Sequence, residues 1–319
     1  MKIFNVTNLE NGQTLEKYVK KCLSEVSLNV IYKLFRKKDI KVNGHWKDAK
    51  YIVSTGDEVK VYIQDELLNQ DNKTVVGRNT IEDLIVYEDN NLLVINKPRG
   101  MLTQKASPRD YALDSRVVEY LVYKNEYNPN INLAFTPGPA HRLDRNTSGL
   151  ILFGKNIETL QYLFYLLKDR EELEKHYLTL VKGEIFEDGE VNAPLKKDEE
   201  TGKVIVDSVK DGAKKAKTIY KVVKRFNGYT LLDITLVTGR THQIRVHMQY
   251  IGHPVIGDNK YGDFKENKYF EKNYHFSNQF LHAYKLIFKE VDEPISYLRN
   301  REIEIKLNKE YLDLLSKLK

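Results

Sequence analysis

The sequence has little of what a secreted or membrane protein requires. Cys22 is the only cysteine among the 319 residues, so no internal disulfide can form, and a single thiol is typical of a reducing cytoplasm. No apolar run reaches the roughly 18 residues that a membrane-spanning helix needs. The first residues, MKIFNVTNLENGQ, lack the apolar core of a secretory signal. We therefore expect a cytoplasmic protein with no membrane association.

Motifs that bind cofactors or metals are also absent. There is no GxGxxG fingerprint after a strand and no GxxxxGK[ST] loop for nucleotide phosphates. A zinc site would call for a CxxC pair or two histidines four residues apart on a helix. His242 and His247 are five residues apart, which separates them by about 140° around a helix. The sequence therefore predicts a protein that uses neither a cofactor nor a metal.

The chain is long enough for about two domains, and it is mildly basic. Its apolar content of 41% and charged content of 30% are ordinary for a soluble protein. The net charge is +6. Residues 1–65 hold 12 lysines and arginines against 8 aspartates and glutamates, so one fifth of the chain carries two thirds of the excess. This distribution is compatible with a polyanionic partner.

Residues 1–65 have the pattern of a small domain with a basic face. Apolar residues at helical spacing predict helices around 15–22 and 30–35, the second capped by Asn29. The pair Asn43-Gly44 in IKVNGHW predicts a tight hairpin, and STGDEVKVYI adds a turn and a strand. Seven basic residues crowd into 18 positions here: Lys33, Arg36, Lys37, Lys38, Lys41, Lys47 and Lys50.

The stretch VIYKLFRKKDIKVNGHWKDA resembles the S4 domain, a module of many RNA-binding proteins. An alternative is a solvated helix end whose cations suit the helix dipole, but the charges continue into the hairpin, which favours RNA binding. Residues 66–82 are polar and weakly patterned, and we interpret them as a linker. The S4 resemblance implies five candidate RNA-binding residues: Lys33, Arg36, Lys37, Lys38 and Lys41.

From residue 83 onward, patterns of strands and helices are mixed, without internal repeats. LIVYEDNNLLVINKP predicts a hairpin around residues 89–91, and apolar residues at helical spacing follow Asn156. Further strands are predicted at KHYLTLVKG, AKTIYKVVKRF and YTLLDITLVTG. The mixture predicts an α+β domain over residues 83–319, with a mixed, largely antiparallel central sheet flanked by helices and loops.

One carboxylate is conspicuous in HRLDRNTSGLILF, because Arg142 and Arg145 flank Asp144. Neighbouring cations favour the ionised carboxylate, the state required of a group that attacks or accepts a proton near neutral pH. The preceding Pro137-Gly138-Pro139 and the following apolar run would hold this loop in place. The alternative is an ordinary surface aspartate in a turn or at a helix N-cap.

The stretch TGRTHQIRVHMQYIGHPVIGD has the start and stop signals of a short helix. Thr241 is the expected N-cap, an apolar stripe begins at Ile244, and Gly252 lies just past the end. Arg245 lies in the first turns, away from that stripe or along its edge. In the strand KHYLTLVKG, Tyr177 faces opposite to its two neighbours, and by itself it indicates no more than a core tyrosine.

These stretches together resemble the RluA, RluC and RluD type of RNA pseudouridine synthases. HRLDRNTSGLILFGK and TGRTHQIRVHMQYIGHPVIGDNKYG carry most of the resemblance, and NKPRGML, KHYLTLVKG, AKTIYKVV and LHAYKLIF match in the same order. It implies a catalytic domain with an RNA-binding cleft behind a small α/β S4-like domain. It also implies a monomeric, cofactor-free isomerase that converts uridine to pseudouridine, with large-subunit ribosomal RNA as the expected substrate.

The resemblance assigns roles to individual residues. Asp144 corresponds to the essential carboxylate and Arg245 to its salt-bridge partner. Tyr177 corresponds to a tyrosine that stacks on the target base and is a candidate for proton transfer. Ile244 corresponds to an apolar pocket residue, and Arg142 to an arginine that fills the space left by the flipped uridine. Base flipping is required because the reacting atoms lie inside a stacked strand.

Several points stay open at the level of sequence. Asp144 could attack the sugar, attack the base or act as a base, and the uridines modified cannot be read from the chain. A non-catalytic RNA-binding factor in ribosome assembly would keep this fold without the reaction. A hydrolase of glycosidic bonds would need two facing carboxylates, whereas the motif stretches offer one aspartate among several cations.

Overall fold

The structure, a computed structural model, describes residues 1–24, 26–63, 81–107, 110–169 and 172–319. The linker expected at 66–82 lies outside these residues, except for its last two positions. The chain divides into two compact units, each of which we describe by itself. Unit 1 comprises Met1–Leu93, Gln104–Ala140 and Leu152–Phe164, and unit 2 comprises Val94–Thr103, His141–Ile151 and Tyr165–Lys319.

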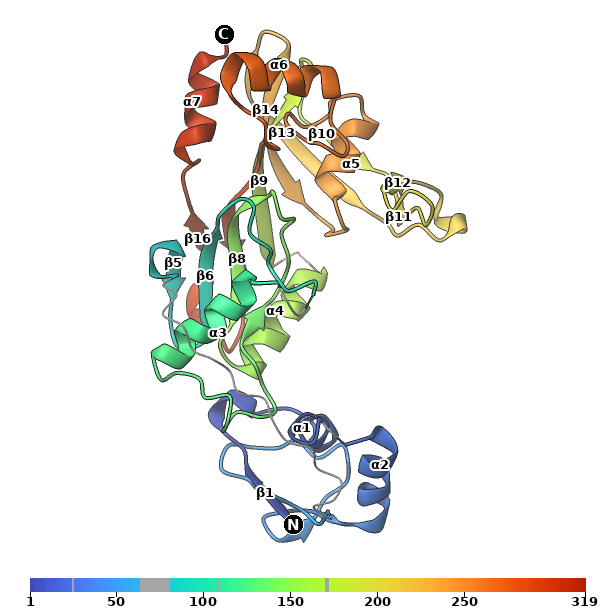
Figure 1. The fold of residues 1–319 in the computed structure, drawn as a ribbon, viewed down its shortest axis with the longest axis vertical. Helices are drawn as coiled ribbons and strands as arrows, with labels where there is room; N and C mark the ends of the chain where they lie inside the picture. The colour runs from blue at the N-terminus through green and yellow to red at the C-terminus, as the bar shows by residue number, and fades with distance from the viewer. Residues whose placement is uncertain (25, 64–80, 108–109, 170–171) are drawn as a thin grey trace. The chain divides into compact units, whose positions relative to one another are not determined.

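Residues 1–63 of unit 1 form a small antiparallel sheet packed against two helices (Figure 1). The sheet has the strand order β1-β4-β2-β3. Along the chain the elements are β1 Lys2–Asn5, η1 Asn8–Glu10, α1 Leu15–Cys22, α2 Leu28–Lys37, β2 Ile40–Val42, β3 His45–Trp46 and β4 Glu58–Val61.

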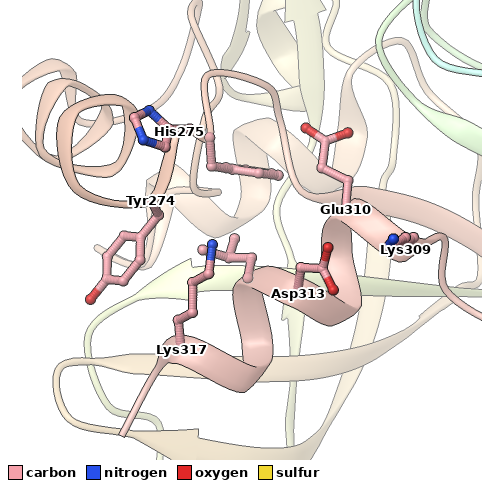
Figure 2. Close-up of a pocket in the computed structure, with 8 residues that line it drawn as sticks. Tyr274, His275, Lys309, Glu310, Asp313 and Lys317 are labelled. Atoms are coloured by element: carbon pink, nitrogen blue, oxygen red, sulfur yellow. The ribbon is translucent and has the colours of Figure 1, made fainter.

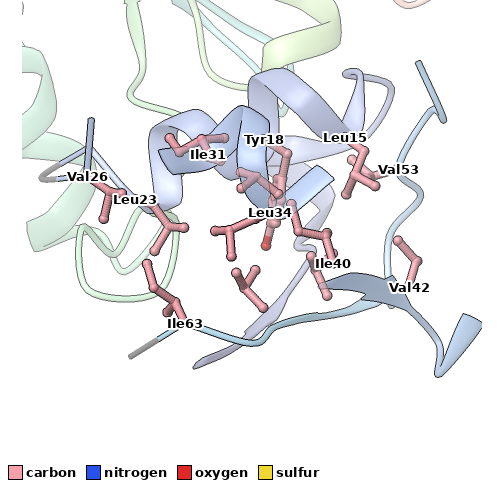
Figure 3. Packing of buried hydrophobic residues seen from close by; sticks show 14 of the residues in the cluster. Leu15, Tyr18, Leu23, Val26, Ile31, Leu34, Ile40, Val42, Val53 and Ile63 are labelled. Atoms are coloured by element: carbon pink, nitrogen blue, oxygen red, sulfur yellow. The ribbon is translucent and has the colours of Figure 1, made fainter. Parts of the chain in front are cut away.

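The apolar residues that predicted the two helices form their buried sides. Tyr18 of α1 and Ile31 of α2 are about 1% exposed and pack with Ile40 and Val42 of β2 (Figure 3). Burial of each such side chain stabilises the fold by about 1.5–3 kcal/mol. The prediction of both helices is therefore confirmed.

The predicted hairpin is confirmed, whereas the predicted cap of α2 is wrong. Asn43 and Gly44 have φ angles of 51° and 80°, the left-handed pair that an Asn-Gly turn adopts between β2 and β3. Ser27, and not Asn29, precedes α2. The backbone N–H groups of Val30 and Ile31 donate to the carbonyl of Ser27, so the helix begins before Asn29.

A buried carboxylate ties the first residues of unit 1 to its later part. Glu10 is fully buried and accepts a hydrogen bond from the backbone N–H of Ala134 at 2.8 Å. The amide of Asn132 donates to the Thr7 hydroxyl at 2.9 Å. Ala134 itself belongs to the hydrophobic cluster of residues 1–63. The remaining elements of unit 1 are η3 Glu82–Leu84, β5 Ile85–Glu88, α3 Leu113–Tyr123 and β7 Gly138–Pro139.

Three elements contribute residues to both units: β6 Leu92–Lys97, β8 Ser148–Gly154 and α4 Ile157–Asp169. The remaining helices of unit 2 are η4 Val209–Asp211, α5 Gln243–Tyr250, α6 Phe264–Tyr274, η5 Ser296–Leu298 and α7 Lys309–Lys317. Its strands are β9 Leu173–Lys182, β10 Gly189–Asn192, β11 Leu195–Lys197, β12 Val204–Val206, β13 Lys217–Phe226, β14 Tyr229–Leu236, β15 Leu281–Phe288 and β16 Arg301–Glu304.

The central sheet of the chain is mixed. Its described strands follow the order β10-β13-β14-β9-β15-β8-β6-β5, with β16 paired to β15 and β7 to β8. The β15–β8 pair is parallel, whereas β10–β13, β13–β14, β14–β9 and β9–β15 are antiparallel. The expected α+β class with a mixed central sheet is therefore confirmed. Within the described residues, no helix is both long and apolar enough to cross a bilayer.

An aromatic cluster packs α6 and α7 against the strands of unit 2. Phe270 of α6 and Tyr311 of α7 are fully buried, together with Phe276 and Phe280. The rings of Phe280 and Tyr311 have centroids 4.3 Å apart. This cluster closes one part of the unit 2 core, close to the connection between α6 and β15.

On β9, successive side chains face opposite sides of the sheet, as expected for a strand. Tyr177 is buried on one side, and His176 lies on the other. His176 Nδ1 lies 3.1 Å from Asp233 Oδ1, and its Nε2 lies 3.3 Å from Glu174 Oε2. Burial lowers the pKa of His176, but the hydrogen bonds and charges of Asp233 and Glu174 raise it on balance.

The raised pKa of His176 predicts a pH-dependent stability. A group whose pKa is higher in the folded state stabilises the fold at low pH, and this contribution is lost as pH rises through the folded pKa. We expect the thermal midpoint of the wild type to fall more between about pH 6 and pH 8 than that of His176→Gln. The exposed His45→Gln is the matched control. Parallel curves for the wild type and His176→Gln would contradict this linkage.

Candidate active site

A buried guanidinium joins two carboxylates in unit 2. Arg245, in the first turn of α5, donates from Nη1 to Oδ2 of Asp144 at 2.8 Å. On its other edge, Nε donates to Oδ2 of Asp258 at 2.6 Å and Nη2 donates to Oδ1 of Asp258 at 2.8 Å. The planar geometry of arginine suits this bidentate contact and leaves a third donor for Asp144.

The two carboxylates on Arg245 differ in their access to solvent. Asp258 is fully buried, whereas the side chain of Asp144 is 28% exposed. Burial raises the pKa of Asp258, but its hydrogen bonds with Arg245 lower it on balance. Burial likewise lowers the pKa of Arg245, and Asp258 and Asp144 raise it above its ordinary value. Asp258 thus anchors the cation, and Asp144 is the carboxylate that a substrate can reach.

Hydrogen bonds on both sides of Asp144 hold its backbone. The Thr103 hydroxyl donates to the carbonyl of Leu143 at 2.9 Å and accepts from the Leu143 N–H at 3.2 Å. The amide of Gln279 donates to the Thr147 hydroxyl at 2.6 Å. Thr103, Thr147 and Gln279 are each at most 3% exposed, so this loop is attached to the interior at two points.

A buried lysine that the sequence did not single out secures the same loop. Lys97 is fully buried, and its Nζ donates to the carbonyls of Pro98, Met101 and Arg145 at 2.9–3.2 Å. Burial lowers the pKa of Lys97 to about 7, against the opposing effect of the Asp144 charge. The Gly100 N–H also donates to the Arg145 carbonyl. Lys97 therefore links the turn after β6 to the residue that follows Asp144.

The flanking arginines are not the ion-pair partners of Asp144 in the described residues. Arg142 is exposed, and Arg145 donates from Nε to the carbonyl of Gly100 at 3.0 Å. Among the described residues, the basic side chains with a nitrogen within 4 Å of an Asp144 oxygen are Arg245, at 2.8 Å, and His242, at 3.9 Å. The cation that pairs with Asp144 is therefore Arg245, 101 positions further along the chain, and neither flanking arginine forms an ion pair with it among the described contacts.

A glycine in the same motif allows the start of β8 to lie close to β15. Gly149 has a φ of 114°, and a Cβ there would lie 2.1 Å from the carbonyl oxygen of Ala283. Ala283 pairs with Gly149 on one side and with Tyr177 on the other. Tyr177, which is 4% exposed, therefore lies one strand away from the start of β8.

The helix that carries Arg245 does not begin as predicted. Thr241 is not its N-cap, because His242 occupies that position with a φ of 56°. The Gln243 side chain reaches back instead, and its Oε1 accepts from the Arg240 N–H at 3.0 Å and from the Thr238 hydroxyl at 2.7 Å. A side chain from inside the helix therefore holds the turn before it, and no side chain of the described residues caps the first helical N–H groups.

The other predicted site residues lie in different surroundings. Ile244 of α5 is 4% exposed, directly before Arg245. In unit 1, the Nζ of Lys38 lies 5.0 Å from the ring centre of Trp46, and that of Lys41 lies 5.3 Å from the ring centre of Tyr62. The basic side chains of α2 that we predicted to bind RNA are exposed: Lys33, Arg36 and Lys37.

Sequence reasoning missed Lys97 and Asp258 as parts of the site, and also His242, which lies 3.9 Å from Asp144, and Tyr261, whose ring centre lies 5.0 Å from the guanidinium carbon of Arg245. All four lie within the stretches that resemble the family, so their neighbourhood was visible. What the sequence does not show is the pairing: the contact of Lys97 with the Arg145 carbonyl and that of Asp258 with Arg245 are set by the fold. Within the described residues, no cluster of side chains is suited to hold a metal ion.

Two surface cavities of unit 2 are distinct from the Asp144 site. One, of about 330 Å³, lies between the end of α6 and α7, where Lys309, Glu310, Asp313 and Lys317 line it (Figure 2). The other, of about 410 Å³, is lined mainly by residues 184–188. Neither lining includes Asp144, Tyr177 or Arg245.

Comparison with known proteins identifies the family. Residues 91–250 match the family model described as RNA pseudouridylate synthase. The chain belongs to the RNA pseudouridine synthase family. The matched region contains Asp144, Tyr177 and Arg245. The protein is thus an RNA pseudouridine synthase, an isomerase that converts uridine to pseudouridine within RNA.

Individual relatives support this assignment over nearly the whole chain. An uncharacterized RNA pseudouridine synthase of Mycoplasma capricolum is 32% identical over 304 residues, covering 94% of this chain and 96% of the relative. Ribosomal large subunit pseudouridine synthase C of Escherichia coli is 34% identical, covering 90% and 88%. The solved structure of human RNA pseudouridylate synthase domain containing 4 shares the fold, with a TM-score of 0.59, 21% identity, and coverage of 75% and 95%.

Proposed function

We propose that this pseudouridine synthase modifies specific uridines of large-subunit ribosomal RNA, with Asp144 as its essential carboxylate. Support for the substrate comes from relatives named ribosomal large subunit pseudouridine synthase C and D, at 33–34% identity. The assignment of the carboxylate rests on one contact, the 2.8 Å hydrogen bond from Arg245 to a partly exposed Asp144. We infer that the enzyme acts as a cytoplasmic monomer.

The proposed reaction requires a carboxylate held in one orientation and a uracil that can turn while it is bound. The glycosidic N1–C1′ bond breaks, the uracil turns, and a C5–C1′ bond forms, after which C5 loses a proton and N1 gains one. Arg245 occupies Oδ2 of Asp144 and leaves Oδ1 for the nucleotide. A carboxylate held in one orientation meets the sugar or base with little loss of freedom, which lowers the barrier.

Three further side chains are proposed to handle the flipped nucleotide. Tyr177 would stack on the target base, and Ile244 would form an apolar wall of its pocket. Arg142, which is exposed, would enter the space that the uridine leaves in the RNA. Flipping costs a few kcal/mol, and stacking on one aromatic ring contributes about 1–3 kcal/mol, so these contacts are of the size needed.

The first 65 residues are proposed to be an S4-like domain that holds the RNA, joined by a linker at 66–82 to a catalytic domain at 83–319. Lys33, Arg36 and Lys37 present exposed cations from one helix. Lys38 and Lys41 lie beside exposed aromatic rings, an arrangement in which cations meet phosphates while rings meet bases.

The role of Asp144 can be tested together with the RNA target. In cells that lack this gene, we expect pseudouridine to be missing from specific positions of large-subunit ribosomal RNA. Wild type and the exposed control Asp313→Asn should restore these positions, and Asp144→Asn should not, because removal of the reacting group lowers turnover by about a thousandfold or more. The measurement is pseudouridine mapping at matched protein levels.

Two outcomes would contradict these proposals separately. Restoration by Asp144→Asn would remove the carboxylate from its role. Loss of pseudouridine from transfer RNA alone would leave the carboxylate in place and overturn the proposed substrate. Purified Asp144→Asn should still bind target RNA within about threefold of the wild type, since Asp144 supplies no positive charge for phosphates.

The proposed RNA-holding residues predict a change in salt dependence. Each phosphate contact contributes roughly 0.7–0.9 to the slope of log affinity against log salt. Lys33→Gln/Lys37→Gln should therefore flatten the slope by about 1–2, whereas turnover at saturating RNA should stay within about twofold. The double variant Lys268→Gln/Lys272→Gln on α6 removes the same charge and serves as the control. An unchanged slope would show that the α2 cations do not contact RNA.

A further inference from the structure

A histidine beside Asp144 has no part in the roles described so far. His242 lies directly before α5 with a φ of 56°, a conformation that few non-glycine residues adopt. Its side chain does not cap the helix. Instead, its Nδ1 lies 2.8 Å from the hydroxyl of Tyr261, and its Nε2 lies 3.9 Å from Oδ2 of Asp144.

The contacts of Tyr261 favour one position for the imidazole proton. The backbone N–H of Val204 donates to the Tyr261 hydroxyl at 2.9 Å. That hydroxyl has a single proton, and His242 Nδ1 lies 2.8 Å away, where it can accept this proton. With Nδ1 as the acceptor of this proton, a neutral imidazole carries its own proton on Nε2, the nitrogen that lies 3.9 Å from Asp144 Oδ2.

The surroundings favour the neutral imidazole. Burial lowers the pKa of His242, and although the charges of Asp144 and Asp258 oppose this, those of Arg245 and Lys260 add to it. The ring therefore remains a neutral donor near pH 7. A neutral donor can orient Asp144 without adding a second positive charge beside it.

Tyr261 connects this histidine with the Arg245 anchor. Its ring, which is 3% exposed, lies with its centre 5.0 Å from the guanidinium carbon of Arg245. Its backbone N–H donates to Oδ1 of Asp258 at 3.0 Å. One residue therefore contacts His242 and Arg245, the two groups beside Asp144, and also Asp258, the buried partner of Arg245.

We propose that His242 is a positioning residue for Asp144, held by Tyr261 in the tautomer that directs Nε2–H toward the carboxylate. Closure of the 3.9 Å gap by about 1 Å when the nucleotide binds would bring Nε2 into hydrogen-bond distance of Oδ2. Arg245 and His242 then both hold Oδ2, and Oδ1 faces the substrate. This inference rests on the proposed role of Asp144.

Nitrogen NMR of the imidazole tests the tautomer directly. In the wild type we expect His242 to carry its proton on Nε2, with a bare Nδ1, at neutral pH. Tyr261→Phe keeps the ring beside Arg245 but removes the hydroxyl, so protonated Nδ1 should appear. A wild-type ring protonated on Nδ1, or a tautomer unchanged in Tyr261→Phe, would overturn the proposal.

Single-turnover isomerisation at saturating RNA tests the consequence. Tyr261→Phe and His242→Asn should each slow the rate by about tenfold or more, with RNA affinity within about twofold. Asparagine tolerates the left-handed backbone but is too short to reach Asp144, whereas His242→Gln retains a donor and should recover part of the rate. Tyr229→Phe, which loses only a hydroxyl bonded to Glu266, is the matched control.

The outcomes separate this inference from the proposed function. An inactive Asp144→Asn beside wild-type rates in both Tyr261→Phe and His242→Asn would overturn the role of His242 alone. An active Asp144→Asn would overturn the proposed function itself. Thermal unfolding of each variant shows whether a slow rate reflects loss of folded protein, and the NMR result of Tyr261→Phe decides the tautomer independently of the rates.

Discussion

The geometry of the site depends on one buried arginine whose two sides face different carboxylates. Asp258 satisfies two donors of Arg245 in the interior, and the third is directed at Asp144. A buried guanidinium without such a partner would be strongly destabilising, so Asp258 makes the position of Arg245 possible. The exposed carboxylate is then held by a cation that cannot itself move toward solvent.

Close backbone packing places this arginine. Gly257, directly before Asp258, has a φ of 76°, and a Cβ there would lie 1.8 Å from the carbonyl oxygen of Asn278. At the other end, the fully buried His247 of α5 donates from Nε2 to the carbonyl of Ala193, and its Nδ1 accepts from the Thr218 hydroxyl. His247 therefore attaches α5 to Thr218 of β13 and to Ala193, and Gly257 lets the turn that carries Asp258 pack against Asn278.

Local sequence patterns predicted those turns and helices that are determined by residues close together in the chain. The pair Asn43-Gly44 predicts its own turn. Tyr18 in α1 and Ile31 in α2 each belong to a set of apolar residues at helical spacing, and both are buried as that spacing predicts. The start of α5 could not be predicted in this way, because its N-cap, His242, makes no side-chain cap and the preceding turn is held instead by the Gln243 side chain, which accepts from Thr238 and Arg240. In helix α6 the buried residue is Phe270, so the sequence of this helix carries little of the apolar spacing from which a helix is predicted.

The site shows the same division between local and distant information. Resemblance to a family supplied Asp144 and Arg245, whose contact joins residues 101 positions apart. No local pattern indicates that Lys97, a residue type usually found at the surface, lies among three carbonyls. The tautomer of His242 likewise depends on a hydroxyl 19 positions away. Such features follow from tertiary contacts, which only the folded chain displays.

The most direct test of this account is the single-turnover rate of Arg245→Lys at saturating RNA. Lysine keeps the charge but offers no planar set of donors that could hold Asp258 and Asp144 together. The account predicts a rate about a hundredfold lower, with RNA affinity within about threefold of the wild type and the protein still folded. A wild-type rate would contradict it, because orientation of Asp144 by the guanidinium would then be unnecessary for catalysis.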